Sequence, residues 1–467
     1  MKLKRSTTIA LTVAVAFFMQ NLDTTAVNTA IPAMARSFDT DVIHLSAGIT
    51  SYMIALAIFI PVSGWIADRF GTRKVFCTAV ALFIIASILC GSSQTLPQFV
   101  LFRVFQGIAG AMMTPVGRLA VLKATPKSKL VSDMNYITMP ALVAPILRPL
   151  VGGYLATYWT WHWIFLLNVP ISIICIVLAW RLMPKDDEAH EGKKHFDMVG
   201  FVLSGLGLAG FMMGVQMFSQ EGVAYYVPVF VILISVSLIL FNMRYARHIS
   251  NPMIDYSILK ILTYRMTVTV GTITRMMIGV TPYLVPLMFQ IGFGLSPFES
   301  GLLFAATMLG NLSMKTLTVQ TIRRFPFKRI LIVNGILIGI FTGCIAFLQA
   351  DTPVWIIVTV MFLTGAVRSM QFTSITTLAF ADIPEKKMTS ANSFYSTIQQ
   401  MSAGMGIAMG AVVLRFSHQI NGGLPGNYNM PDFKLAFIAI AILSIVHLVG
   451  YRKLPSDAGD ILRQKTK

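Results

Sequence analysis

The sequence predicts an all-α polytopic membrane protein with fourteen transmembrane helices, and three observations support this fold class. Apolar runs fill nearly the whole chain of 467 residues, and a helix needs about 20 apolar residues to cross the hydrocarbon core. Hydrophobic residues make up 55% of the chain and charged residues 12%, which is too little charge for a soluble protein of this length. The runs are also too long and too uniformly apolar for the alternating strands of a membrane barrel.

The predicted helices follow these runs in chain order, and a polar or basic loop separates each from the next. Their predicted limits are 8–31, 42–66, 75–93, 97–122, 133–157, 163–181, 198–218, 225–245, 265–291, 299–321, 328–348, 353–379, 390–414 and 433–452. The first run follows the basic start MKLKRST and has no cleavage site of small residues after it. We therefore interpret it as a retained first helix and not as a signal peptide.

Basic residues predict the orientation of the helices. Of the 37 Lys and Arg residues, 28 lie in the two termini and in every second loop, and three lie in the opposite loops. Because positive charge stays on the cytoplasmic side, both termini are expected in the cytosol, which requires an even number of spans. The net charge of +18 then reflects membrane topology. Without a soluble basic domain, the sequence indicates no nucleic-acid partner.

Three short matches indicate an internal repeat. They occur in the same order along the chain, at offsets of roughly 255–265 residues. The matching segments are Arg69–Lys74 with Arg324–Arg329, Arg103 and Gln106 with Arg368 and Gln371, and Pro126, Lys129 and Ser132 with Pro384, Lys387 and Ser390. Two parallel six-helix halves of this kind are the arrangement of transporters that rock around a central site.

The repeat predicts a division of the chain into five parts, with two helices inserted between the halves. The parts are an N-terminal six-helix half at 1–181, a cytoplasmic linker at 182–197, the two inserted helices at 198–245, a cytoplasmic connector with the C-terminal six-helix half at 246–452, and a cytoplasmic tail at 453–467.

Motifs of pumps and hydrolases are missing from the sequence. It contains no Walker-type phosphate loop, no zinc-protease motif and no nucleophile elbow, so no ATP-driven or hydrolytic enzyme is predicted. The four cysteines lack metal-ligand spacing and are expected to be packing residues. We expect no cofactor and no metal. The expected partners are a small-molecule substrate, protons and the lipid bilayer.

Four segments resemble the motifs of a known family. Gly64–Lys74 (GWIADRFGTRK) resembles the signature loop of the major facilitator superfamily. Leu22–Pro32 (LDTTAVNTAIP) is similar to the first-helix motif of its fourteen-span drug:proton antiporters, the EmrB/QacA type. Arg103-x-x-Gln106-Gly107 in span 4 and Trp161–Pro170 (WHWIFLLNVP) at span 6 strengthen the resemblance, which covers essentially the whole chain. It implies proton-driven export across a bacterial cytoplasmic (inner) membrane.

The resemblance implies a gating role for the signature loop. The carboxylate near the end of span 2 is expected to pair with the basic loop or with a neighbouring helix N-terminus. The residues expected in this role are Gly64, Asp68, Arg69, Gly71 and Arg73.

Span 5 departs from the family pattern. Antiporters of the family carry Gly-Pro-x-x-Gly-Gly there, and Arg148 stands at the position of the first glycine. The surrounding prolines and paired glycines, Pro145, Pro149, Gly152 and Gly153, still predict a kink. Arg148 either faces the cavity, or the inference of antiport weakens.

Charges inside predicted spans point to a pathway or an ion pair, because a charge is costly at the bilayer centre. Asp23 is the one acidic residue well inside a span. At 1.5 Å per residue, Asp23 lies about 12 Å and Arg103 about 9 Å from the outer ends of their spans, so the two can pair. A conformational change that separates them would let Asp23 exchange a proton. The alternative is a permanent structural pair that locks spans 1 and 4.

The resemblance implies that spans 1, 4, 9 and 12 line a central cavity. Arg275 in span 9 and Arg368 in span 12 are therefore candidate substrate-binding residues, together with Gln106, Arg148 and Gln371. The alternative for Arg275 and Arg368 is that each caps a carbonyl or lies in a helix interface. An excess of arginine over carboxylate in the spans predicts anionic or zwitterionic amphiphiles as substrates, in preference to quaternary ammonium compounds.

Two further basic residues, Arg118 and Lys315, lie within two turns of a cytoplasmic helix end. Their side chains are expected to extend to the interface.

The predicted function is that of a proton-coupled antiporter that exports amphiphilic organic compounds by alternating access. One alternative is a proton symporter or uniporter that imports an anionic metabolite. Another is a membrane sensor or partner-binding protein that does not transport. The sequence does not identify the substrate, the oligomeric state or a periplasmic adaptor.

Overall fold

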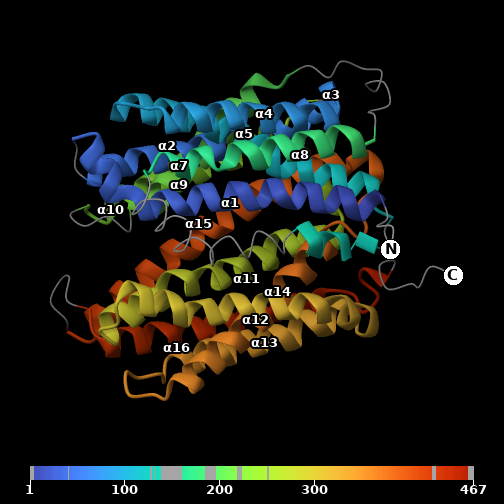
Figure 1. Ribbon diagram of the computed structural model, residues 1–467. Helices are drawn as coiled ribbons and strands as arrows, with labels where there is room; N and C mark the ends of the chain where they lie inside the picture. The colour runs from blue at the N-terminus through green and yellow to red at the C-terminus, as the bar shows by residue number, and fades with distance from the viewer. Residues whose placement is uncertain are drawn as a thin grey trace. The chain divides into compact units, whose positions relative to one another are not determined.

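The computed structural model describes residues 5–39, 42–126, 129–130, 132–137, 160–184, 196–217, 223–249, 252–422 and 428–460. All regular secondary structure within these ranges is helical, which confirms the predicted all-α class. Figure 1 shows long helices lying side by side within each of the two units described below.

The helices follow the predicted spans in chain order. In the first part of the chain they are α1 (Arg5–Ser37), α2 (Val42–Phe59), α3 (Val62–Phe70), α4 (Thr72–Gly91), α5 (Leu96–Ala124), α7 (Trp163–Leu166), α8 (Asn168–Leu182), α9 (Met198–Met217) and α10 (Tyr226–Tyr245). In the second part they are η2 (Tyr256–Lys260), α11 (Leu262–Leu287), η3 (Met288–Gly292), α12 (Pro297–Arg324), α13 (Phe327–Ile345), α14 (Val354–Ala379), η4 (Glu385–Lys387), α15 (Met388–Ile420), α16 (Met430–Val446) and η5 (His447–Lys453).

Among the described residues, eleven helices are long and apolar enough to cross a membrane, or twelve if a bent pair counts as one span. The predicted span 133–157 lies mostly outside the described residues. The predicted total of fourteen spans therefore stays a prediction.

The second predicted span is a broken helix. α2 ends at Phe59, α3 begins at Val62, and the two axes meet at 57°. Pro61 lies at this break, where its ring and its missing amide hydrogen interrupt the helical hydrogen bonds. A proline pair has a milder effect in α11, where Pro282 and Pro286 precede the wider turn of η3.

The chain packs as two compact units. Unit 1 comprises Met1–Gly210, Ile234–Tyr256 and Pro384–Thr397, and unit 2 comprises Phe211–Leu233, Ser257–Ile383 and Ile398–Lys467. The domain boundaries drawn from the sequence repeat stay a prediction.

In unit 1, α5 is the central helix. α2 and α4 both pack along it, and α8 packs against α1 and α4 (Figure 1). The candidate site residues of α1 and α5 therefore lie in the interior of this unit.

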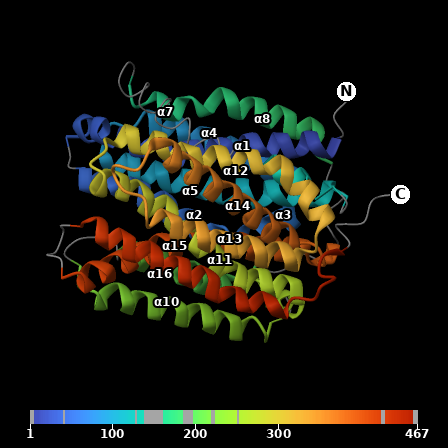
Figure 2. The ribbon, with the colours of Figure 1, turned by 90° about the horizontal axis from the view of Figure 1, so that it is seen from below.

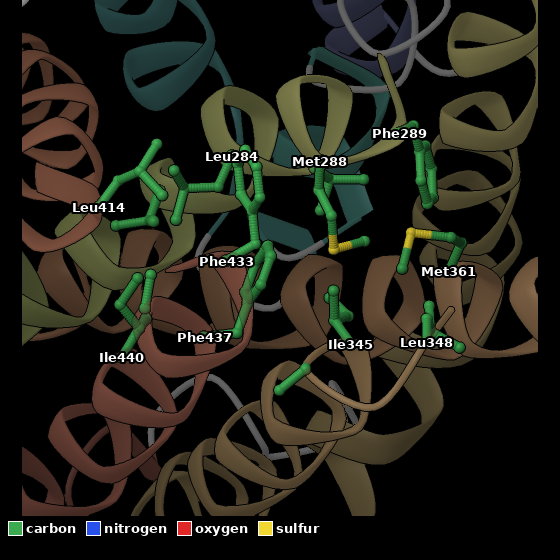
Figure 3. Packing of buried hydrophobic residues seen from close by; sticks show 14 of the residues in the cluster. Leu284, Met288, Phe289, Ile345, Leu348, Met361, Leu414, Phe433, Phe437 and Ile440 are labelled. Atoms are coloured by element: carbon green, nitrogen blue, oxygen red, sulfur yellow. The ribbon is translucent and has the colours of Figure 1, made fainter. Parts of the chain in front are cut away.

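In unit 2, α14 is the central helix. It packs along α12 and against α11 and α13, and α13 also packs against α16 (Figure 2). A cluster of buried apolar residues from α11, η3 and α13 to α16 fills one end of this unit, among them Leu284, Phe289, Ile345, Met361 and Phe433 (Figure 3). Gly365 of α14 faces the carbonyl of Thr307 in α12, where a Cβ atom would overlap it.

Candidate functional site

A buried ion pair joins α1 to α5 inside unit 1. Nη1 of Arg103 donates a hydrogen bond to Oδ2 of Asp23 at 2.7 Å, and the exposed fraction of both side chains is 0%. The structure thus brings together the two residues that the sequence analysis placed at similar depth.

Two amide side chains complete the surroundings of the carboxylate. Nε2 of Gln106 and Nδ2 of Asn168 both donate to Oδ1 of Asp23, at 3.1 and 3.2 Å. Gln106 also accepts from Nη1 of Arg103 at 2.6 Å and donates to Oγ of Ser87 at 2.9 Å. The network therefore connects α1, α4, α5 and α8.

Aromatic rings flank the guanidinium of Arg103. Its Cζ atom lies 4.5 Å from the ring centroid of Tyr52 and 5.7 Å from that of Phe165. Among the described residues, Nε and Nη2 of Arg103 have no hydrogen-bond partner. A buried charge with unsatisfied donors is costly, and inside a membrane such a charge marks a functional pathway or an ion pair.

Small residues on α5 let its neighbours approach the ion pair. A Cβ atom at Gly107 would lie 2.5 Å from the carbonyl oxygen of Tyr52, and one at Gly110 would lie 3.3 Å from Nε2 of Gln20. Oε1 of Gln20 in turn accepts from Oγ1 of Thr114 at 2.5 Å. These positions recur at helical spacing, so one stripe of α5 faces both α1 and α2.

The same arrangement recurs in unit 2, one repeat later. Nη2 of Arg368 in α14 donates to the backbone carbonyl of Ile278 in α11. Gln371 accepts from Nδ2 of Asn334 in α13 at 3.1 Å and donates to the carbonyl of Leu331 at 3.2 Å. In each unit the arginine thus reaches the first helix of the repeat, and the glutamine reaches the third.

Arg275 is buried in α11, and its Nη1 donates to the carbonyl of Thr267 at 3.3 Å. Arg275 and Arg368 therefore make the carbonyl contacts of the alternative interpretation. Their predicted role in substrate binding stays a prediction.

The expectation that Arg118 and Lys315 extend to the membrane interface is wrong. Their exposed fractions are 5% and 4%. Nη1 of Arg118 donates to Oγ of Ser396 at 3.2 Å, and Nζ of Lys315 donates to Oγ1 of Thr373 at 2.7 Å. Hydroxyl groups of neighbouring helices thus meet both charges inside the protein.

The signature loop lines a separate cavity of about 1680 Å³ in unit 1. Asp68, Arg69, Gly71 and Arg73 are on its wall, whereas Asp23 and Arg103 are not. Gly71 joins α3 to α4 with a φ of 90°, a conformation that favours glycine. The Cζ atom of Arg73 lies 4.6 Å from the ring centroid of Trp180.

Gly64 of α3 lies beside Ser393, and a Cβ atom at Gly64 would overlap the serine Oγ. The span-5 residues Pro145, Arg148, Pro149, Gly152 and Gly153 lie outside the described residues.

The sequence did not predict a site role for Ser87, Tyr52 or Asn334, and it indicated Asn168 only as part of a family motif. Polar residues are common in these spans, and most of them only join helices. For Asn334 the internal repeat contained a usable signal. Gln371 matches Gln106 in the repeat, so a polar partner on the helix before Gln371 could have been expected.

Comparisons with known proteins agree on one family. The family model described as Major Facilitator Superfamily matches residues 13–407 and, in a second match, residues 268–465.

Curated relatives carry the name "Putative multidrug resistance protein MdtD". The relative from Pectobacterium atrosepticum is 33% identical over 454 residues, covering 97% of this chain and 96% of its own length. The relative from Klebsiella pneumoniae is 33% identical over 461 residues, with the same coverage of both chains.

Among solved structures, the proton:xylose symporter XylE has a similar fold. The TM-score is 0.63 at 13% identity, with 97% of this chain and 96% of that chain covered.

Proposed function

The chain belongs to the major facilitator superfamily, a family of membrane transporters and not of enzymes, and we propose that it is a proton-coupled antiporter. It exports amphiphilic organic compounds across the bacterial cytoplasmic membrane by alternating access. The observation that carries the proposal is the buried carboxylate of Asp23, which accepts hydrogen bonds from Arg103, Gln106 and Asn168. The multidrug resistance named in its relatives is consistent with export.

Proton binding and ion pairing compete for the same carboxylate. In the described geometry, three donors on α5 and α8 stabilise the charged form of Asp23. A shift of α5 or α8 away from α1 would remove these donors and allow Asp23 to take up a proton. The return shift would restore the donors and expel the proton.

Vectorial transport follows if the two conformations open to opposite sides. Asp23 takes up a proton when the site is open to the outside and substrate leaves, and it releases the proton when the site is open to the cytosol and substrate binds. Arg103 pairs again with the carboxylate of Asp23 after each release of the proton, so Asp23 is either protonated or paired with Arg103. The fourteen-span topology with cytoplasmic termini, and the gating role of the loop at Asp68, belong to this proposal.

The direction of proton movement tests the proposal. Everted membrane vesicles that contain the protein are acidified inside by respiration, and amphiphilic dyes are then added outside. An antiporter will carry dye inward and protons outward, so the lumen becomes more alkaline. The matched control is the Asp23→Asn variant at the same abundance.

Two other outcomes would contradict antiport. Acidification of the lumen on addition of a dye would indicate a symporter. Dye binding without any movement of dye or protons would indicate a sensor or partner-binding protein.

A further inference from the structure

The two buried arginines of the repeat differ in the group that meets their charge. Arg103 donates to the carboxylate of Asp23, and Arg368 donates to the backbone carbonyl of Ile278. Ile278 lies 255 residues after Asp23, which is also the offset between Arg69 and Arg324 in the repeated loop. Arg368 thus donates to a neutral carbonyl in unit 2, whereas Arg103 donates to a carboxylate in unit 1.

The helices of unit 2 supply no other carboxylate to this position. The α-helices α11 to α16 contain two acidic residues, Glu299 and Asp432. Glu299 lies in the first turn of α12, where it forms a capping box with Ser296. Asp432 lies at the start of α16 and accepts from Nδ1 of His418 at 2.6 Å. Both carboxylates are therefore held at helix ends.

The guanidinium of Arg368 has more N–H donors than the one hydrogen bond it makes among the described residues uses. A guanidinium carries five N–H donors and binds a carboxylate through two of them in parallel. Among the described residues, the hydrogen bond from Nη2 to the carbonyl of Ile278 is the one that Arg368 makes. Its exposed fraction is 7%, compared with 0% for Arg103. Arg368 is therefore buried, but a small part of its surface remains exposed, whereas Arg103 is fully buried.

We propose that Arg368 is the receptor for an anionic group of the transported compound, and that the substrate class is amphiphiles bearing a carboxylate, sulfonate or phosphate. This inference rests on the proposed transport function. The substrate's anion accepts hydrogen bonds from Arg368 in unit 2 as the carboxylate of Asp23 does from Arg103 in unit 1, so the repeat uses one arginine for the proton site and the other for the transported compound. The amine of Lys315 lies in the same region, because its Nζ donates to Oγ1 of Thr373, one to two turns along α14 from Arg368.

Equilibrium binding to the purified full-length protein in lipid nanodiscs tests the inference without requiring a proton gradient. The probes are a rhodamine dye with a free carboxylate and the methyl ester of the same dye, which lacks that negative charge and carries one more methyl group. Fluorescence anisotropy gives the dissociation constant of each. Loss of a charge-assisted hydrogen bond corresponds to about tenfold in affinity or more, so the wild-type protein should bind the free acid at least about tenfold more tightly than the ester.

Two substitutions and one matched control locate the anion. Arg368→Gln should abolish the preference for the free acid. Ile278→Asp should abolish it too, because the new carboxylate would pair with Arg368 as Asp23 pairs with Arg103. Ile278→Asn introduces the same shape without the charge and should keep the preference. Arg368→Lys keeps a cation, so part of the preference should survive even if other variants bind poorly.

An unchanged preference in Arg368→Gln or in Ile278→Asp would overturn the inference and return Arg368 to a structural role. Tighter binding of the ester by the wild-type protein would also overturn it. The proposed antiport is tested separately by proton flux in the Asp23→Asn variant, so it can survive failure of the anion site, and an anion preference can survive failure of proton coupling.

Discussion

Removal of Arg103 is expected to destabilise the protein through the charge that it leaves behind. In Arg103→Ala the buried carboxylate of Asp23 keeps only the amide donors of Gln106 and Asn168, at 3.1 and 3.2 Å. Loss of one partner from a buried pair costs about 3–5 kcal/mol in soluble proteins. An interhelical hydrogen bond in a membrane averages only about 0.6 kcal/mol. A decrease of several kcal/mol in the free energy of unfolding would therefore show that an unpaired charge is buried, and not that one hydrogen bond is lost.

The Asp23→Asn substitution provides the second arm of a double-mutant cycle. In the wild-type background it should lower the free energy of unfolding, because Arg103 loses its counter-ion. In the Arg103→Ala background it should raise the free energy of unfolding, because no buried charge remains. The assay is unfolding by sodium dodecyl sulfate in mixed micelles, followed by circular dichroism. If Asp23→Asn has no effect or is destabilising in the Arg103→Ala background, the ion-pair reasoning is refuted.

Three further changes test individual contacts. Gly107→Val should lower the free energy of unfolding by about 1–3 kcal/mol in the same assay, because its Cβ atom would lie 2.5 Å from the carbonyl oxygen of Tyr52. The control is Gly301→Ala, which should be near neutral because no atom lies within 4 Å of the added Cβ atom. Asn168→Ala removes one neutral donor to Asp23, so kcat/KM for proton-driven export should fall by about 2- to 10-fold, and a complete loss would show that Asn168 does more than orient the carboxylate. Asp432→Ala removes the acceptor of His418 and of the backbone amide of Asn429, at 2.6 and 3.0 Å; hydrogen exchange should become faster at the facing ends of α15 and α16, and unchanged exchange would contradict the structural role.

The fold was largely predictable because each predicted span is a separate apolar run in the sequence. The bend at Pro61 was not predicted, since a proline inside a span is compatible with either a kink or an unbroken helix. The grouping of the helices into two packed units depends on contacts between distant segments, and a single sequence contains only weak signals of those contacts.

The candidate site was predictable where charge is rare. Asp23 and Arg103 stand out because few ionisable residues occur inside the spans. Their similar predicted depth in the membrane indicated that they form a pair. Asn168 and Ser87 did not stand out, since many polar residues occur in these helices. The carbonyl partner of Arg368 could not be predicted, because every residue offers a carbonyl and only the packing of α11 against α14 selects Ile278.

The most direct test of the account is a comparison of exchange and proton coupling in the Asp23→Asn variant. Proteoliposomes that contain the purified protein are loaded with a rhodamine dye, and two quantities are measured: exchange of internal for external dye without a pH gradient, and uphill dye transport with proton movement under a gradient. The account predicts that Asp23→Asn retains exchange but loses uphill transport and the accompanying proton flux. Full proton-driven uphill transport by this variant would contradict the assignment of Asp23 as the proton-coupling residue.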